Sequence, residues 1–186
     1  MLDWINFLPQ RTHVFVDEAF VDFTGQPSLV SAVRSRVNLW ILRSMTKFYA
    51  IPGLRLGYLI GSGVEGLRRY REPWQVNVLA EVAGLAALED AQHAEESLKL
   101  VQRERLWIWK QLRGLPYLRS FPTNVNYFLA RCGNDEALDR LQAGLEAENV
   151  LIRDCRTVEG LSGPYFRFAV LNHAENELLL AHLRRL

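Results

Sequence analysis

The apolar run from Asn38 to Leu42 leads into a segment that carries a hydroxyl, a lysine and an arginine, and this succession restricts the fold most strongly. The run predicts a buried strand, and Ser44, Lys47 and Arg55 follow it. Apolar residues 48–51 stand next to the lysine, and an apolar wall disfavours the ammonium form. A lysine that loses its proton attacks carbonyl groups, while a hydroxyl and a guanidinium together can hold a phosphate. The alternative is a turn between two strands in which Lys47 and Arg55 are solvated.

A second apolar run, Val14 to Val16, comes earlier in the chain and ends in Asp17. In α/β sheets, ligands bind outside the carboxyl ends of the strands. We therefore expect Asp17 to lie at the same edge of a sheet as Ser44 and Lys47. An enzyme of pyridoxal 5′-phosphate (PLP) needs an acid for the pyridinium nitrogen, a lysine for the aldehyde and an anion site for the phosphate.

Three segments resemble the fold-type I PLP enzymes of aminotransferase class I/II. They are Asp17-Glu18-Ala19-Phe20, Ser44-x-x-Lys47 and Gly53-Leu54-Arg55-Leu56-Gly57-Tyr58. The resemblance extends over nearly all 186 residues, but it covers only the second half of such an enzyme. It implies an α/β fold, namely the C-terminal part of an aspartate aminotransferase-like large domain followed by a small α+β C-terminal domain. We expect residues 1–72 to belong to the large PLP-binding domain and residues 73–186 to form the interdomain helix and the small domain.

Within this superfamily the chain is most similar to the L-threonine-O-3-phosphate decarboxylases of cobalamin biosynthesis, whose near relatives are the histidinol-phosphate aminotransferases. The segment from Thr46 to Gly53 favours the decarboxylases, as do residues 73–77 and 151–155. Phe20 favours them as well, because the aminotransferase branch usually has a tyrosine at this position.

The resemblance implies a role for several polar side chains. Lys47 and Asp17 are the expected catalytic residues, because Lys47 would bind PLP covalently and Asp17 would keep the pyridine nitrogen protonated. The expected cofactor-binding residues are Asp17, Ser44, Lys47 and Arg55. The expected substrate-binding residues are Asn77, Arg153 and Arg167. Considered without the resemblance, Arg167 can form a salt bridge or face solvent, and Arg153 can be an ordinary charge at a strand end.

The expected activity of the complete enzyme is PLP-dependent decarboxylation of L-threonine O-3-phosphate to (R)-1-amino-2-propanol O-2-phosphate, for assembly of the cobalamin nucleotide loop. One alternative is transamination like that of histidinol-phosphate aminotransferase. An alternative of another class is a non-catalytic fragment or one half of a split enzyme, because this sequence lacks the family's N-terminal half. That half supplies a glycine-rich phosphate loop, an aromatic ring that stacks on the cofactor and an asparagine that contacts the ring oxygen.

Hydrophobic periodicity predicts alternating strands and helices. In the first part the expected strands are residues 13–16, 39–43 and 54–60, and the expected short helices are residues 29–36 and 64–70. Residues 78–112 are predicted to be rich in helix. In the second part we expect strands at residues 125–130, 150–153 and 165–170, a helix at residues 135–148, and a last helix after the capping-box sequence Asn172-x-x-Glu175.

The net charge, the hydrophobicity pattern and the cysteine and histidine content argue against several classes of protein. A formal charge of +1 gives no reason to expect nucleic acid, and the run Arg68-Arg69-Tyr70-Arg71 fits a solvated helix face. No apolar run reaches the roughly 18 residues of a membrane helix, and the first residues do not resemble a signal peptide, so we expect a cytoplasmic protein and no membrane partner. Cys132 and Cys155 are expected to be free thiols, and four scattered histidines predict no metal site. The expected partners are a small phosphorylated amino-acid substrate and, in the full-length enzyme, the second subunit of a homodimer.

Overall fold

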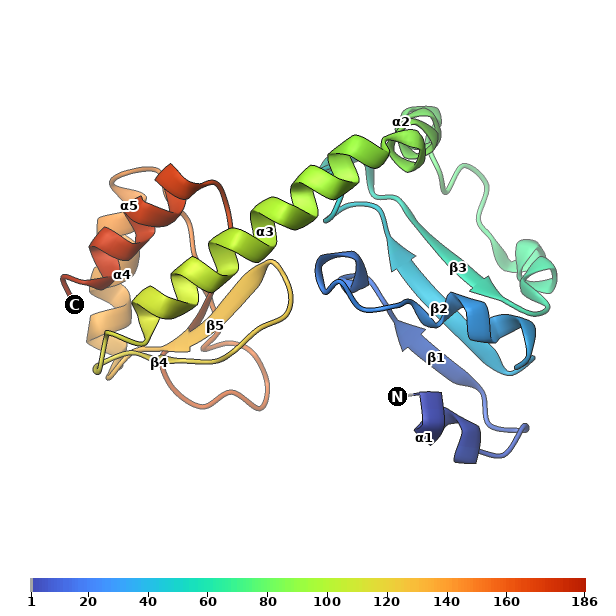
Figure 1. Cartoon of the computed structure of the whole chain (residues 1–186), viewed down its shortest axis with the longest axis horizontal. Coiled ribbons are helices and arrows are strands. Elements are labelled where there is room, and N and C mark those ends of the chain that lie inside the picture. The colour runs from blue at the N-terminus through green and yellow to red at the C-terminus, as the bar shows by residue number, and fades with distance from the viewer. Residues whose placement is uncertain (1) are drawn as a thin grey trace. The chain divides into compact units, whose positions relative to one another are not determined.

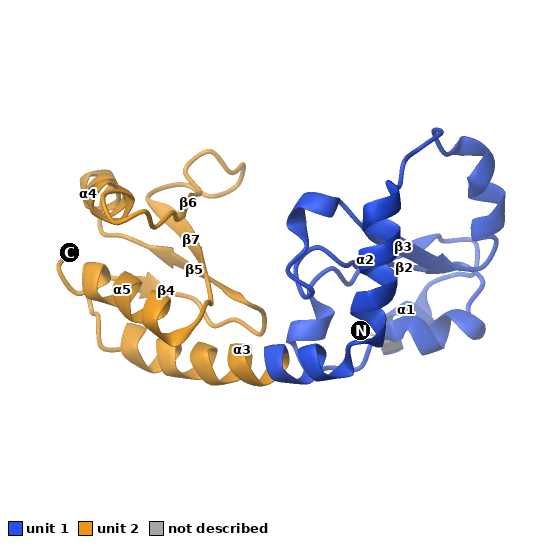
Figure 2. Cartoon of the chain, turned by 90° about the horizontal axis from the view of Figure 1, so that it is seen from above, with its two compact units in different colours: residues 1–97 blue, residues 98–186 orange. Residues whose placement is uncertain are grey.

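The computed structural model describes residues 2–186, and the chain forms two compact units (Figure 1). Unit 1 comprises residues 1–97 and unit 2 comprises residues 98–186, as coloured in Figure 2. The assignment of residues 1–72 and 73–186 to two domains of a complete enzyme stays a prediction.

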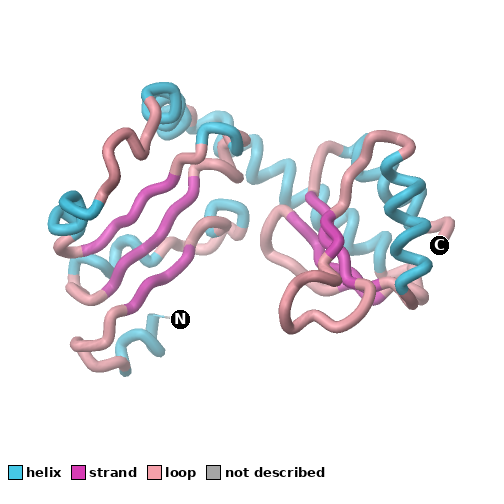
Figure 3. Tube along the Cα trace, turned by 180° about the vertical axis from the view of Figure 1, so that it is seen from behind, coloured by secondary structure: helices cyan, strands magenta, loops and turns pink. Residues whose placement is uncertain are grey.

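Unit 1 is built on a three-stranded sheet in the order β1-β2-β3. Its strands are β1 (Val14–Asp17), β2 (Leu39–Ser44) and β3 (Gly57–Gly61), which lie side by side in Figure 3. β1 and β2 run parallel, whereas β3 is antiparallel to β2. The helical segments in the described part of this unit are α1 (Leu2–Phe7), the 3-10 helices η1 (Val21–Phe23), η2 (Leu29–Arg34), η3 (Pro52–Leu54) and η4 (Val64–Tyr70), then α2 (Val78–Glu89) and the first part of α3 (Ala91–Leu112).

Helical segments cover one face of this sheet. The buried cluster on that face consists of Ile5 from α1, Val33 from η2, and Val14, Leu39 and Ile41 from the strands. Because side chains alternate along a strand, Phe15, Trp40 and Leu42 point to the other face. The rings of Phe15 and Trp40 stack there with centroids 5.1 Å apart, and the side chains of Phe15 and Leu42 are 61% and 41% exposed. The sheet of unit 1 therefore has one buried and one open apolar face.

Helix α2 packs through its small residues and exposes its large ones. Ala80 and Gly84 are the buried positions, and a Cβ atom added at Gly84 would lie 2.4 Å from the Cδ2 atom of Leu56. The exposed large side chains of this helix are Val78, Leu79, Val82, Leu85 and Leu88. The helix begins at Asn77, whose side chain accepts a hydrogen bond from the Ala80 amide, which is an ordinary N-cap.

Unit 2 contains a four-stranded antiparallel sheet in the order β4-β5-β7-β6. Its strands are β4 (Arg119–Ser120), β5 (Tyr127–Arg131), β6 (Arg153–Asp154) and β7 (Tyr165–Ala169). Its helices are the second part of α3, α4 (Asp135–Glu146) and α5 (His173–Leu183).

One face of the unit 2 sheet closes a core with these helices. Phe128, Ala130, Phe166 and Phe168 are buried on that face. The helices contribute the buried residues Ile108, Leu112, Leu138, Leu141, Leu145, Leu179, Leu180 and Leu183. Asn172 and Glu175 form the capping box that the sequence predicts, with both reciprocal hydrogen bonds present at the start of α5.

The predicted elements are present, but several boundaries differ. The third strand begins at Gly57 rather than at residue 54, because residues 52–54 form a 3-10 turn and Arg55 adopts a left-handed conformation with φ 55°. The strand expected at residues 150–153 is reduced to Arg153–Asp154, and β4 was not predicted, because two residues give no detectable periodicity. The short helix expected at residues 29–36 is a 3-10 helix at residues 29–34.

Three further observations concern the described residues. Among residues 2–186, no helix combines the length and the apolar character that crossing a membrane requires. The same residues contain no group of three or more histidine, cysteine, aspartate or glutamate side chains that could hold a metal ion. Cys132 and Cys155 are both buried free thiols, and burial raises the pKa of Cys132 to about 11.

Candidate active site

The carboxyl ends of β1 and β2 place Asp17 and Ser44 at one edge of the unit 1 sheet. Asp17 lies opposite Leu42 in the parallel register, and Ser44 is two residues further along β2. Residues two apart on a strand share a face, so Asp17 and Ser44 point to the same, open face of the sheet. Lys47 follows in the turn after β2, which the Ala50 amide closes with a hydrogen bond of 3.3 Å to the Lys47 carbonyl.

Three side chains form a hydrogen-bonded cluster in this turn. Lys47 Nζ donates to Ser44 Oγ at 3.0 Å, and Ser44 Oγ lies 2.9 Å from Thr46 Oγ1. The Thr46 amide also donates to Ser44 Oγ at 3.4 Å. Thr46 is a member of this cluster that the sequence-predicted site residues do not include. A second hydroxyl two positions after Ser44 was the signal that could have identified it.

The surroundings of Lys47 differ from the expected apolar wall. Phe48 is buried while Lys47 is exposed, because consecutive residues of the turn point in different directions. The apolar surface near the amine comes instead from the segment after β1, where the ring centroid of Phe20 lies 5.6 Å from Lys47 Nζ. The expectation that residues 48–51 form this wall is therefore wrong, and Phe20 provides the contact.

Asp17 is exposed and held in one orientation. Its Oδ1 atom accepts a hydrogen bond of 2.8 Å from the Ala19 amide. Its Oδ2 atom accepts no hydrogen bond from the described residues, so one carboxylate oxygen is available to a ligand. A cavity of about 580 Å³ is lined in part by Asp17. Its lining includes Val16, Asp17, Glu18, Phe20, Thr24 and Leu29.

Arg55 and Asn77 lie on the segments that follow. The Met45 amide donates to the Leu56 carbonyl at 3.1 Å, which brings the segment with Arg55 beside the one with Ser44. The exposed guanidinium of Arg55 donates from Nη1 to the Pro52 carbonyl at 2.9 Å and keeps further donors for an anion. Asn77 caps α2 and donates to the Leu54 carbonyl at 3.4 Å, so it connects the helix to the turn before Arg55.

Arg153 and Arg167 belong to unit 2 and lie directly opposite each other on β6 and β7. Both are exposed, and Arg167 stacks on the ring of Tyr127 at 5.0 Å. Phe166 and Phe168 are buried on the other face, as the alternation along the strand predicts. Neither arginine side chain forms an ion pair with a described residue, so the salt-bridge alternative for Arg167 is not realised within residues 2–186. Like charges directly opposite each other are unfavourable, which makes this pair a candidate site for an anion.

A family model of aminotransferase class I and II matches residues 3–183. The chain belongs to this family. The threonine-phosphate decarboxylase of Salmonella typhimurium is 40% identical over 176 residues, which are 92% of this chain and 48% of the relative. The chain thus spans about half the length of the curated relatives it matches.

Two solved structures agree with this membership. The histidinol-phosphate aminotransferase from Clostridium acetobutylicum has a TM-score of 0.88 at 32% identity. The L-threonine-O-3-phosphate decarboxylase from Porphyromonas gingivalis has a TM-score of 0.86 at 28% identity. Each match covers 99% of this chain and 57% of the solved one. The predicted fold class is confirmed, and so is the prediction that the chain matches only the C-terminal half of such an enzyme.

PLP is the cofactor of this family, as the sequence analysis predicts. The side chains at the edge of the unit 1 sheet fit its three functional ends. The free oxygen of Asp17 suits a protonated ring nitrogen, and the amine of Lys47 suits the aldehyde. Ser44 and Arg55 together provide donors for a phosphate.

Proposed function

We propose that this chain provides the lysine-bearing half of a PLP-dependent enzyme that decarboxylates L-threonine O-3-phosphate to (R)-1-amino-2-propanol O-2-phosphate. The observation that carries the proposal is the hydrogen bond between Lys47 and Ser44, next to the ring of Phe20 and at the same sheet edge as Asp17. The decarboxylase from Salmonella typhimurium, at 40% identity, supports this reaction over others of the family.

In unit 1, each polar group has a separate task. Lys47 holds the aldehyde end of the cofactor, and Ser44 and Arg55 donate hydrogen bonds to its phosphate. Asp17, oriented by the Ala19 amide, keeps a proton on the ring nitrogen by pairing with it. PLP, when bound, supplies an electron sink for the bond that breaks at the substrate Cα atom.

In unit 2, Arg153 and Arg167 bind the anionic ends of the substrate, which are a carboxylate and a phosphate. Guanidinium groups suit both, because their planar donors match two oxygens at once. Asn77 provides a further amide contact to the substrate. With PLP bound, these residues would select decarboxylation by orienting the carboxylate of the substrate.

A second candidate is transamination like that of histidinol-phosphate aminotransferase. The similarity to the Clostridium acetobutylicum structure, at 32% identity, is the observation that favours it. The two reactions are separated by joining this chain to the N-terminal half of the Salmonella relative and assaying the completed enzyme. We expect CO₂ release from threonine phosphate, whereas amino transfer from histidinol phosphate to 2-oxoglutarate without CO₂ would favour the second candidate.

The proposal also includes the oligomeric state and the domain organisation of the completed enzyme. The completed enzyme is a cytoplasmic homodimer with residues 1–72 in its large domain and residues 73–186 in its interdomain helix and small domain. A third possibility is that the chain is a non-catalytic fragment or half of a split enzyme. Sedimentation of the completed enzyme shows whether it is a dimer. Absence of any turnover would support the alternative of a non-catalytic fragment.

The role of Lys47 can be tested on the chain itself, which contains three lysines, Lys47, Lys99 and Lys110. Reductive labelling with PLP and borohydride, followed by peptide mass spectrometry, should modify Lys47 about tenfold faster than the other two, because a phosphate clamp raises the local concentration of the reagent. Pyridoxal, which lacks the phosphate, is the matched reagent and should lose this preference, as should Arg55→Met. Equal labelling of the three lysines by PLP would remove Lys47 from the proposal.

A further inference from the structure

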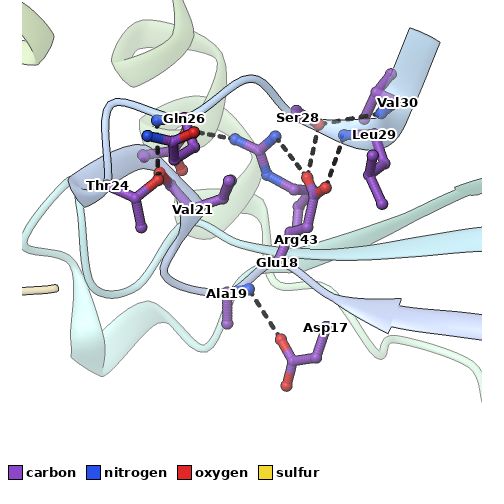
Figure 4. A network of polar contacts seen from close by, with 11 residues as sticks. Asp17, Glu18, Ala19, Val21, Thr24, Gln26, Ser28, Leu29, Val30 and Arg43 are labelled. Atoms are coloured by element: carbon purple, nitrogen blue, oxygen red, sulfur yellow. Dashed lines mark hydrogen bonds and ion pairs between the residues drawn. The ribbon is translucent and has the colours of Figure 1, made fainter. Parts of the chain in front are cut away.

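A buried ion network lies directly behind the proposed cofactor edge (Figure 4). Glu18 is only 6% exposed, and its carboxylate accepts hydrogen bonds from Ser28 Oγ at 2.6 Å and from the Leu29 amide at 2.8 Å. Arg43 Nη1 approaches the same carboxylate at 3.5 Å. Buried charges are costly unless they are paired, so these contacts indicate a segment that is held firmly in place.

Arg43 connects this carboxylate to a second acid. Its Nη2 group donates to Asp22, and the arginine side chain is 14% exposed. One guanidinium on β2 therefore holds residues on both sides of Phe20, namely Glu18 two positions before it and Asp22 two positions after it. We call Glu18, Asp22 and Arg43 the arginine clamp.

The clamp and the cofactor edge occupy opposite faces of the sheet. Glu18 follows Asp17 and Arg43 precedes Ser44, and neighbouring residues of a strand point to opposite faces. Figure 4 shows the Asp17 side chain pointing away from the contacts of Glu18, Ser28 and Arg43. The clamp thus connects to Asp17 and Ser44 through the backbone of β1 and β2.

We propose that Arg43 is a positioning residue that sets the places of Asp17 and Phe20 relative to Lys47. The inference rests on the proposed function, in which Asp17 and Lys47 bind two ends of the same cofactor. Groups that act on one ligand must be held within about 0.5 Å of their productive positions. Backbone pairing fixes β1 against β2 up to the hydrogen bond of 2.8 Å from the Glu18 amide to the Leu42 carbonyl. Beyond that bond, the clamp holds the segment that carries Phe20, together with the packing of the buried Phe23 ring against Phe48.

The test compares variants at two partly buried arginines of the same unit. Arg43→Met keeps the length of the side chain and removes the charge, and Arg43→Lys keeps the charge with fewer donors. Arg36→Met is the matched control, because Arg36 donates to Asn6 Oδ1 at 3.0 Å and to the Leu8 carbonyl at 3.1 Å, away from the clamp.

The first measurement is amide hydrogen exchange in the chain of 186 residues. In Arg43→Met, exchange in residues 18–30 should rise by about tenfold, while the amides of residues 39–42 keep their protection, because the strand pairing does not depend on the clamp. Arg43→Lys should restore part of the protection, and Arg36→Met should leave residues 18–30 unchanged. Unchanged exchange in Arg43→Met would overturn the inference, whatever the chain does with PLP.

The second measurement is the site preference of PLP labelling, taken at a temperature where circular dichroism shows every variant folded. A merely structural arginine would change the melting temperature but not the ratio of label on Lys47 to label on Lys99. We expect this ratio to fall in Arg43→Met and to recover in Arg43→Lys. A wild-type chain without preference for Lys47 would contradict the proposed function, and the exchange result would then still decide on the clamp. A preference that Arg43→Met leaves intact would overturn the positioning role alone.

Discussion

The two units of the chain treat their apolar residues differently. In unit 2, the sheet and its helices enclose several large apolar side chains, with Phe128, Phe166 and Leu180 at most 1% exposed. In unit 1, Phe15 and Val78 are 61% and 69% exposed, and Trp74, just before α2, is 96% exposed. Parallel strands are normally covered on both faces. Unit 1 therefore leaves large apolar side chains open on its sheet and on α2, whereas unit 2 encloses the phenylalanines of its sheet.

This difference predicts that substitutions in the two units change different kinetic constants of the completed enzyme. In the completed enzyme, Asp17→Asn keeps the shape of the side chain but removes the charge that pairs with the ring nitrogen. We expect kcat to fall about 10³-fold, which corresponds to about 4 kcal/mol of barrier. Arg167→Gln in unit 2 is the counterpart, and it should mainly raise KM, because it weakens binding of an anion that is present before and during the reaction. A loss below about tenfold for Asp17→Asn would remove this carboxylate from the mechanism.

The second prediction concerns the stability of unit 2. Glu104 on α3 is 2% exposed and lies 3.0 Å from His173 Nδ1 and 3.2 Å from Asn176 Nδ2 on α5. Glu104→Ala removes this connection between the two helices, and the free energy of unfolding should fall by about 3 kcal/mol. Glu177→Gln, an exposed site on α5, is the control and should change it by less than about 0.5 kcal/mol. Urea unfolding followed by circular dichroism measures both, and equal values would show that α3 and α5 do not depend on this contact.

The same contact predicts a pH dependence. Burial raises the pKa of Glu104, but hydrogen bonds from His173, Asn176 and Arg103 outweigh burial and hold it below the ordinary glutamate value. A carboxyl whose pKa is lower in the folded state adds stability above its unfolded pKa, and this stability is lost as the pH falls through the folded value. The difference between wild type and Glu104→Ala should therefore be full at neutral pH and shrink below about pH 4.

The smallest expected effect on stability tests the open face of unit 1. Phe15→Thr replaces an exposed aromatic ring by another good strand former, so the free energy of unfolding should change by about 0.5 kcal/mol or less. Self-association, measured by sedimentation velocity, should weaken, because contiguous exposed apolar surface promotes contact between chains. Leu151→Thr, at an exposed leucine of unit 2 with 79% exposure, should alter neither quantity. Equal effects of the two variants on association would erase the contrast between the units.

Sequence patterns were sufficient to place the ends of strands. Asp17, Ser44 and Lys47 follow apolar runs, and the topology of an α/β sheet brings such ends to one edge. The alternation of side chains along β7 likewise predicted that Arg167 points to the sheet face opposite to that of Phe166 and Phe168. The four-residue pattern from Asn172 to Glu175 predicted the capping box, because the hydrogen bonds of this motif are local.

What the sequence did not reveal depends on contacts distant along the chain. The clamp joins Glu18 to Arg43 across 25 positions, and no local pattern marks such a pair. The start of β3 was misplaced because Arg55 takes a left-handed conformation that is uncommon for its type. The exposed leucines and valines of α2 have helical spacing, but periodicity alone does not tell which protein surface covers an apolar helix.

The facing arginines of β6 and β7 imply a link between dissolved salt and folding. Two cations held at the same register repel each other, and an anion seated between them removes that repulsion. Any species that binds the folded state alone shifts the unfolding equilibrium by mass action. Sulfate or phosphate should thus raise the melting temperature of unit 2 more than chloride does at equal ionic strength, even without PLP. The melting temperature of unit 2 would then depend on the concentration of a doubly charged anion.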